Sequence, residues 1–211
     1  MSSLADPNRF LEIFQPDRCP ICFLVHDYAQ EHLKAILDES VTDPTSRDVI
    51  SRSQGFCRRH AWRAVQQNQI LGLAIIYGGL LEEGLKDIHS RPRIWGKKAA
   101  KGCPICESEQ KREQSLVREF SRCWAQSEKL RKTFGERGIL CLSHFRNALA
   151  QKMDGVLRKS LYENGKNALE RLLKDLNEFL EKQDYHRAKE SLGQERDAWV
   201  RAVRMVSGER E

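Results

Sequence analysis

The sequence Cys19-Pro20-Ile21-Cys22 is followed, after 34 intervening residues, by Cys57-Arg58-Arg59-His60. The same arrangement returns later, where Cys103-Pro104-Ile105-Cys106 precedes Cys141-Leu142-Ser143-His144 at the same separation. Each of the four positions recurs at a shift of 84 residues. The pattern uses six of the seven cysteines and two of the six histidines. We therefore interpret it as a duplicated motif.

Three cysteines and one histidine are the donors of a tetrahedral Cys3His metal site. Two thiolates three positions apart can converge on one ion, and a second pair completes the coordination shell. We therefore predict two such sites, with eight ligands: Cys19, Cys22, Cys57, His60, Cys103, Cys106, Cys141 and His144. We expect each ion to take its four ligands from one half of the chain, clasping the ends of a helical hairpin. Exchange of ligands between the halves is the alternative.

The ligand set predicts two Zn²⁺ ions, because four protein ligands with no open position are typical of structural zinc. An iron–sulfur cluster stays an alternative, since soft ligands alone do not separate iron from zinc. The remaining cysteine, Cys123, breaks the repeat and is expected to be a buried apolar residue. No histidine outside the motif is assigned a catalytic role.

Composition predicts an all-α fold. Of the 211 residues, 40% are hydrophobic and 31% charged, with few aromatic residues, and no convincing alternation of period two occurs. We expect tandem duplicated helical repeats, each clasped by a Cys3His site. The predicted division is a first repeat over 1–90, a basic linker over 91–101, a second repeat over 102–184 and a C-terminal helix within 185–211 that packs on the body.

Two helices are predicted in more detail. The nearly continuous apolar run within 70–88 suggests a helix that is buried on several sides. The C-terminal segment carries Trp199, Val203 and Val206 at helical spacing, which suggests an amphipathic helix docked through these residues.

The net charge of +6 is unevenly distributed, because residues 91–135 carry 12 Lys and Arg against 5 Asp and Glu. A basic stretch at 91–112 could meet phosphate or an acidic partner. The expected partner is therefore a protein or a nucleic acid. No apolar run is long enough to span a bilayer, and no signal-peptide pattern follows Met1, so we expect a cytoplasmic protein without a membrane partner. The sequence leaves the oligomeric state open.

Several segments together resemble a family of uncharacterised prokaryotic proteins catalogued as a domain of unknown function. They are CPIC, VTDPTSRD, GFCRRHAW, LGLAIIYGGLL and the ending DYHRAKESLGQERDAWVRAVRMVSG. The resemblance covers most of the chain and is closer in the first half. It implies Cys/His metal binding and no particular substrate.

Three functions follow from these observations. The first is a non-enzymatic, zinc-binding helical module that mediates protein or nucleic-acid interaction. The second is a thiol-based redox or metal sensor, whose thiolates oxidise and release metal. The third is an enzyme with a pocket between the repeats. No nucleophile–base set, phosphate-binding loop or open metal position supports the third function.

Overall fold

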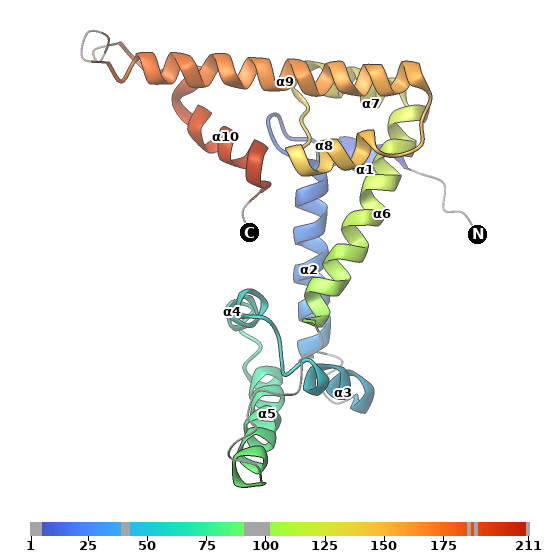
Figure 1. Cartoon of the computed structure of the whole chain (residues 1–211), viewed down its shortest axis with the longest axis vertical. Coiled ribbons are helices and arrows are strands. Elements are labelled where there is room, and N and C mark those ends of the chain that lie inside the picture. Colours follow the sequence, from blue (N-terminus) through green and yellow to red (C-terminus); the bar gives the residue numbers. More distant parts are fainter. Residues whose placement is uncertain (1–5, 39–42, 91–101, 185–186, 188–189, 210–211) are drawn as a thin grey trace. The chain divides into compact units, whose positions relative to one another are not determined.

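The structure, a computed structural model, describes residues 6–38, 43–90, 102–184, 187 and 190–209 (Figure 1). Within these residues the chain forms ten α-helices, one short 3-10 helix and no strand. The elements are α1 (Pro7–Glu12), α2 (Pro20–Asp38), α3 (Pro44–Arg52), α4 (Arg58–Gln66), α5 (Ile70–Ser90), α6 (Pro104–Gln126), α7 (Glu128–Arg137), α8 (Leu142–Leu149), α9 (Gly155–Glu181), η1 (Gln194–Asp197) and α10 (Ala198–Ser207). The predicted all-α class is thus confirmed for the described part of the chain.

Local sequence signals set the helix starts. Pro7, Pro20, Pro44 and Pro104 each occupy the first position of a helix, where the missing N–H costs nothing. Side chains cap several of the other orphan N–H groups: the Asp43 carboxylate accepts from the backbone nitrogens of Thr45 and Ser46 at 3.2 and 3.1 Å, for example. These side-chain caps belong to helices that carry no predicted ligand, whereas α4 and α8 begin at Cys57 and Cys141 without a side-chain cap hydrogen bond.

The chain forms two compact units. The first unit combines Met1–Leu24 with Glu113–Glu211, and the second is Val25–Arg112. Both boundaries fall inside helices, because α2 and α6 each contribute residues to the two units. A tandem repeat is not shown by the described residues, and the predicted linker 91–101 lies outside them. The division into repeats therefore stays a prediction.

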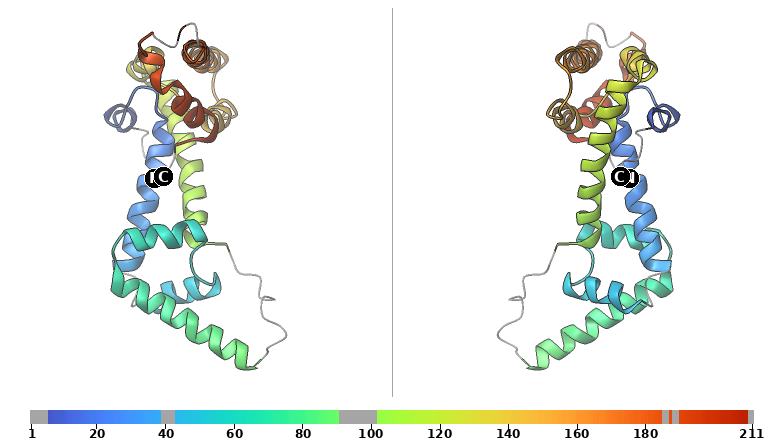
Figure 2. Two further views of the ribbon diagram at one scale, coloured as in Figure 1. Left: turned by 90° about the vertical axis from the view of Figure 1, so that its left-hand side faces the viewer. Right: turned by 90° about the vertical axis from the view of Figure 1, so that its right-hand side faces the viewer.

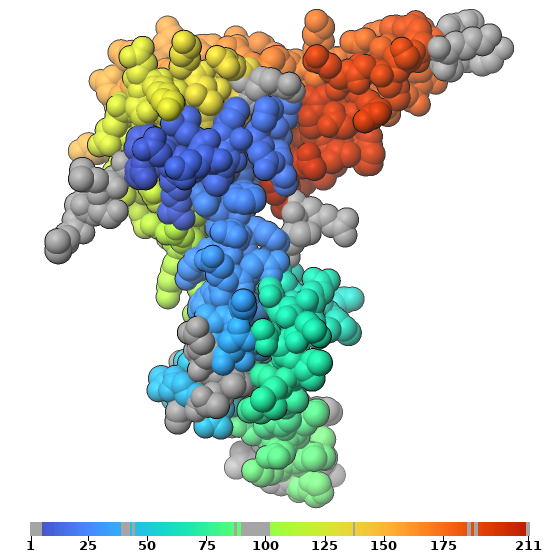
Figure 3. All heavy atoms as spheres, turned by 180° about the vertical axis from the view of Figure 1, so that it is seen from behind, coloured from blue at the N-terminus to red at the C-terminus, as the bar shows by residue number. Residues whose placement is uncertain are grey.

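The core of the first unit is aromatic. Phe10 packs edge-on against Phe120, with ring centroids 5.3 Å apart, and Phe134 contacts both Phe120 and Trp124. Cys123, which directly precedes Trp124 in the sequence, is fully buried, as predicted. On one face of this unit the C-terminal residues meet the N-terminal segment, where the Arg18 guanidinium donates to Glu209 at 3.0 Å (Figure 3).

The C-terminal helix α10 packs on α8 and α9, but through a different face from the one predicted. Trp199, Val203 and Val206 are exposed, whereas Ala198 and Met205 are buried. The third inward residue of the helix is charged: the Arg201 guanidinium donates to Asp175 on α9 at 2.9 Å and to Asp197 at 2.8 Å. Because these ion pairs satisfy Arg201, α10 can dock with a buried arginine, which apolar periodicity alone does not anticipate.

The second unit has an aliphatic core. The α2 residues Leu33 and Leu37 are buried with Ile50 on α3 and Ile76 on α5, and both α3 and α4 pack on α5 (Figure 2). Helix α5 approaches α2 so closely that a Cβ atom at Gly72 would lie 2.4 Å from the Leu37 carbonyl oxygen. The prediction that α5 is buried on several sides is wrong. One face packs on the core, and many of its large side chains are exposed.

Candidate metal centres

All four predicted ligand pairs lie at helix N-termini. Cys19 and Cys103 directly precede α2 and α6, and Cys22 and Cys106 lie in the first turns of those helices. Cys57 and Cys141 are the N-cap residues of α4 and α8, so that His60 and His144 lie one turn inside. The positive end of each helix dipole therefore favours thiolate over thiol at every cysteine of the motif.

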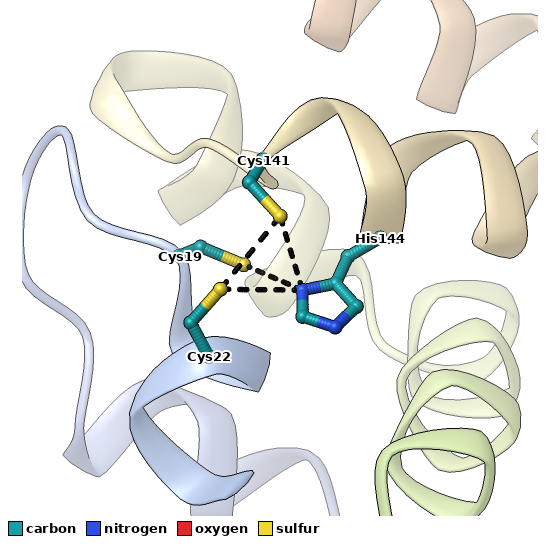
Figure 4. A group of neighbouring side chains, drawn as sticks. All are labelled: Cys19, Cys22, Cys141 and His144. Atoms are coloured by element: carbon teal, nitrogen blue, oxygen red, sulfur yellow. Dashed lines mark hydrogen bonds between the residues drawn. The ribbon is translucent and has the colours of Figure 1, made fainter. Parts of the chain in front are cut away.

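The eight side chains gather into two quartets. The first centre contains Cys19, Cys22, Cys141 and His144, and the second contains Cys57, His60, Cys103 and Cys106. Within each centre the four ligand atoms lie within 4.8 Å of one another. Figure 4 shows the three sulfurs of the first centre and the imidazole Nδ1 of His144 turned toward one another.

The spacing of these atoms matches a tetrahedral ion. With Zn–S bonds of about 2.3 Å and Zn–N bonds of about 2.05 Å, a tetrahedron would place sulfurs about 3.8 Å apart and sulfur about 3.6 Å from nitrogen. In the first centre Cys22 Sγ lies 3.7 Å from Cys141 Sγ, and the three sulfurs lie 3.2–3.4 Å from His144 Nδ1. The second centre gives 3.6 Å between Cys57 Sγ and Cys106 Sγ, and 3.3–3.5 Å to His60 Nδ1. None of the six cysteines of the motif forms a disulfide, which would require a sulfur–sulfur distance of about 2.05 Å.

The expectation that each quartet comes from one half of the chain is wrong. Each centre joins a Cys-x-x-Cys pair from one half to a Cys-x-x-His pair from the other. Helix lengths give the reason. The 19 residues of α2 carry the chain about 28 Å from Cys19, and the nine residues of α3 return it by at most about 14 Å. Two helices of such unequal length do not form the expected hairpin, and Cys57 meets Cys103 and Cys106 at the beginning of α6 instead.

Each ligand histidine has a carboxylate on its other ring nitrogen. Glu113 Oε1 lies 2.8 Å from His144 Nε2, and Glu109 Oε1 lies 3.2 Å from His60 Nε2. Such a carboxylate fixes the tautomer that presents Nδ1 to a metal and increases the basicity of the ring. The Glu109 carboxylate is also held by the guanidinium groups of Arg59 and Arg63. Both glutamates lie on α6, one turn apart.

The comparisons with known proteins concern the whole chain. Residues 10–211 match a family described as a family of unknown function, DUF6062. The chain belongs to this family. Another protein similar to this DUF6062 chain is an uncharacterised 23.9 kDa protein in the xynA 3′ region of Caldicellulosiruptor sp. (strain Rt8B.4). It is 31% identical over 202 residues, which cover 94% of this chain and 98% of the relative. No solved structure matches. The predicted family resemblance is thus confirmed.

Sequence reasoning missed the two glutamates of this DUF6062 protein. They lie in the stretch ESEQKREQ, whose charge density is typical of a solvent-facing helix surface. The duplicated motif gives no hint either, since a shift of 84 residues places Val25 and Ala29 at the corresponding positions. The one signal in the sequence was that Glu109 and Glu113 are spaced by one helical turn shortly after Cys106. This spacing identifies them as histidine partners only once the positions of His60 and His144 are known.

The centres differ in burial and in electrostatics. Three of the four side chains of the first centre are buried, whereas Cys57 and Cys106 of the second are partly exposed. Without an ion, burial lowers the pKa of His60, but its hydrogen bonds with Cys103 and Glu109 outweigh burial and raise the pKa to about 9. At Cys103 the effects have the opposite signs. Burial raises the pKa of this thiol, but the hydrogen bond with His60 outweighs burial and lowers the pKa to about 6. Without an ion, these opposite pKa shifts favour an imidazolium at His60 beside a thiolate at Cys103.

Removal of the Glu113 carboxylate should weaken metal binding at the first centre only. We expect Glu113→Gln to lower the zinc affinity of that centre about 10- to 100-fold, the usual cost of losing a carboxylate behind a ligand histidine. Competition with a chromogenic chelator measures this affinity. Glu107→Gln, which makes the same charge change at an exposed position of α6, is the matched control and should leave both affinities unchanged. If Glu107→Gln lowered the zinc affinity of the first centre as much as Glu113→Gln does, Glu113 would act only through its charge.

Proposed function

We propose that this protein is a non-enzymatic helical module in which each of the two Cys3His centres holds one structural Zn²⁺ ion. The observation that carries the proposal is the tetrahedral spacing of three sulfurs and one Nδ1 atom in each quartet. Four protein ligands would complete the coordination shell, whereas catalytic zinc keeps a position for water. This supports a structural role over an enzymatic one.

The distances also bear on which metal fits. An iron–sulfur cluster distributes its protein ligands over two or four iron atoms, so ligands on different irons are separated by the width of the cluster. The ligand atoms here are only 3.2–3.7 Å apart along the contacts that join them. This spacing supports a single ion at each centre, and the Cys3His donor set favours zinc.

The folded module would act by binding a protein or nucleic-acid partner. The basic excess at 91–112 supports this part of the proposal, although 91–101 lie outside the described residues. In the described remainder Lys111 is exposed, while the Arg112 guanidinium lies over the Tyr28 ring, 5.6 Å from its centroid. No helix in the described part of the chain is long and apolar enough to cross a membrane.

Elemental analysis combined with X-ray absorption at the zinc edge tests the proposal. Protein produced without added metal should contain two zinc ions per chain, be colourless and show three sulfur and one nitrogen neighbours per ion. Cys123→Ser, which removes the cysteine outside both centres, should keep both ions. Brown, iron-containing protein would contradict the zinc assignment. Mild peroxide should release no zinc; reversible release from the more exposed second centre would instead support a thiol-based sensor.

A further inference from the structure

Helix α5 carries an exposed apolar stripe along the face turned away from its unit's core. Its members follow one another in alternating steps of three and four residues: Leu71, Ala74, Gly78, Leu81, Leu85 and Ile88. The large side chains are strongly exposed, at 73% for Leu71, 69% for Leu81, 57% for Leu85 and 42% for Ile88. We call this line of six residues the α5 stripe.

The packing of the second unit does not explain the α5 stripe. Helix α5 is attached to its unit through the opposite face, where Ile76 is buried and Gly72 approaches Leu37. Gly78 differs from Gly72, because a Cβ atom added at Gly78 would meet no atom within 4 Å. Glycine inside a helix is destabilising relative to alanine. The missing side chain at Gly78 therefore has no use within the unit.

The spacing of the α5 stripe identifies what fits against it. Apolar residues in alternating steps of three and four, an average of 3.5 residues, form the seam by which one helix packs lengthwise against another. The stripe is also self-complementary when two copies run antiparallel. Leu71 then faces Ile88 of the second copy, Ala74 faces Leu85, and Gly78 faces Leu81. The small residues Ala74 and Gly78 thus each oppose a leucine, as in a well-packed core.

We propose that the α5 stripe is the interface of a two-fold symmetric dimer, in which the α5 helices of two copies of this chain pack antiparallel. Such a pairing uses the same patch on both copies, as a two-fold interface requires. A parallel pairing would place Ala74 against Ala74 and Gly78 against Gly78, leaving two successive layers unfilled. It would also bring the Glu82 side chains of the two copies to the same level, whereas the antiparallel pairing separates them.

The available area suits a specific dimer. With the neighbouring Ile70 and Ile75, which are also exposed, the large side chains of the α5 stripe expose about 700 Å² per copy. Two copies could therefore bury at most about 1,400 Å², which lies in the lower part of the range of stable specific interfaces. Charged side chains are absent from Ile70 to Leu81 and begin at Glu82, so the central layers would bury no charge.

Sedimentation equilibrium of the metal-loaded full chain tests the dimer. Between about 1 and 100 µM protein, we expect the mass to rise from that of one 24.4 kDa chain to twice that value. Leu81→Glu should abolish the increase, because it would place a carboxylate opposite Gly78 at the centre of the seam. Leu173→Glu is the matched control, since Leu173 on α9 is 58% exposed but lies outside the α5 stripe. It should still dimerise.

A size swap tests the antiparallel register. Gly78→Leu alone should weaken association at least 10-fold, and the double variant Gly78→Leu, Leu81→Ala should restore it, because the small and large residues merely change places. Unchanged zinc content and circular dichroism confirm that each variant is folded. A wild-type chain that is monomeric at 100 µM would overturn the proposal. Binding of that monomer to lipid vesicles would assign the α5 stripe to a membrane surface instead. Failure of the swap to restore a wild-type dimer would overturn the register.

Discussion

Acidification should strip zinc from the protein and unfold it, starting with the second centre. Zinc binds thiolate and neutral imidazole, so protons compete with the metal and the zinc affinity falls as the pH falls. Without an ion the pKa of Cys103 in the second centre is about 6, so below about pH 6 a proton competes with zinc for this thiolate. In the first centre, hydrogen bonds from Cys19 and Cys22 hold the pKa of Cys141 far below its ordinary range, so we expect protons to compete less with zinc there.

The expected loss of stability is large. Structural zinc contributes about 10–16 kcal/mol to the folding of zinc-finger peptides near neutral pH, and the net stability of a whole domain is only about 5–15 kcal/mol. A chain without zinc should therefore lose its cooperative thermal transition. Dialysis at stepwise lower pH, with zinc content and circular dichroism measured at each step, follows both effects. Return to about pH 7.5 with zinc is the control and should restore the transition.

Two outcomes would contradict this prediction. If the metal-free protein melts at the same temperature as the zinc-loaded protein, the ions contribute nothing to folding. If the first centre empties before the second, the difference in burial and in thiolate pKa does not govern release. Chelation at constant neutral pH separates metal loss from acid effects on other ion pairs, and should produce the same unfolded state.

The sequence predicted the helical class and the identity of the residues in the quartets because both depend on local chemistry. A proline after the first cysteine of a C-x-x-C pair marks a helix start, and Pro20 and Pro104 do open α2 and α6. The three-residue separation of Cys57 from His60, or of Cys141 from His144, places both side chains of a pair within one turn, whatever the rest of the chain does. These features can be recognised without knowing the tertiary structure.

The pairing of the ligand sets could not be predicted, because it depends on how far each helix carries the chain. The expected hairpin required two successive helices of similar length, whereas α2 has 19 residues and α3 only nine. The supporting carboxylates were missed for a related reason. Glu109 and Glu113 act on histidines 49 and 31 residues away in sequence, and nothing local distinguishes them from solvated acids.

Burial was predicted wrongly where apolar residues were assumed to face the core. On α10 Trp199 is exposed, whereas Arg201 is buried and its charge is satisfied by ion pairs with Asp175 and Asp197. On α5 the apolar composition was taken as a sign of burial on several sides, although Leu71 and Leu81 are exposed. Hydropathy alone cannot separate a helix face that packs within its unit from a face that remains free for a partner.

Paired ligand substitutions should reveal which residues share an ion. Loss of one thiolate leaves an incomplete shell, so we expect any single ligand substitution to cost one zinc ion and to destabilise one unit. A second substitution costs a further ion only if it falls in the other centre. Cys22 and Cys141 lie in the first centre, whereas Cys57 lies in the second. The double variants Cys22→Ser, Cys141→Ser and Cys22→Ser, Cys57→Ser therefore have different expected stoichiometries.

Native mass spectrometry of these two double variants counts the bound zinc directly, with the single variant Cys22→Ser and the Cys123→Ser control measured alongside. Ligand sharing across the two halves predicts one remaining zinc in Cys22→Ser, Cys141→Ser and none in Cys22→Ser, Cys57→Ser. The reverse result, with one zinc remaining when Cys22 and Cys57 are replaced together and none when Cys22 and Cys141 are, would contradict it.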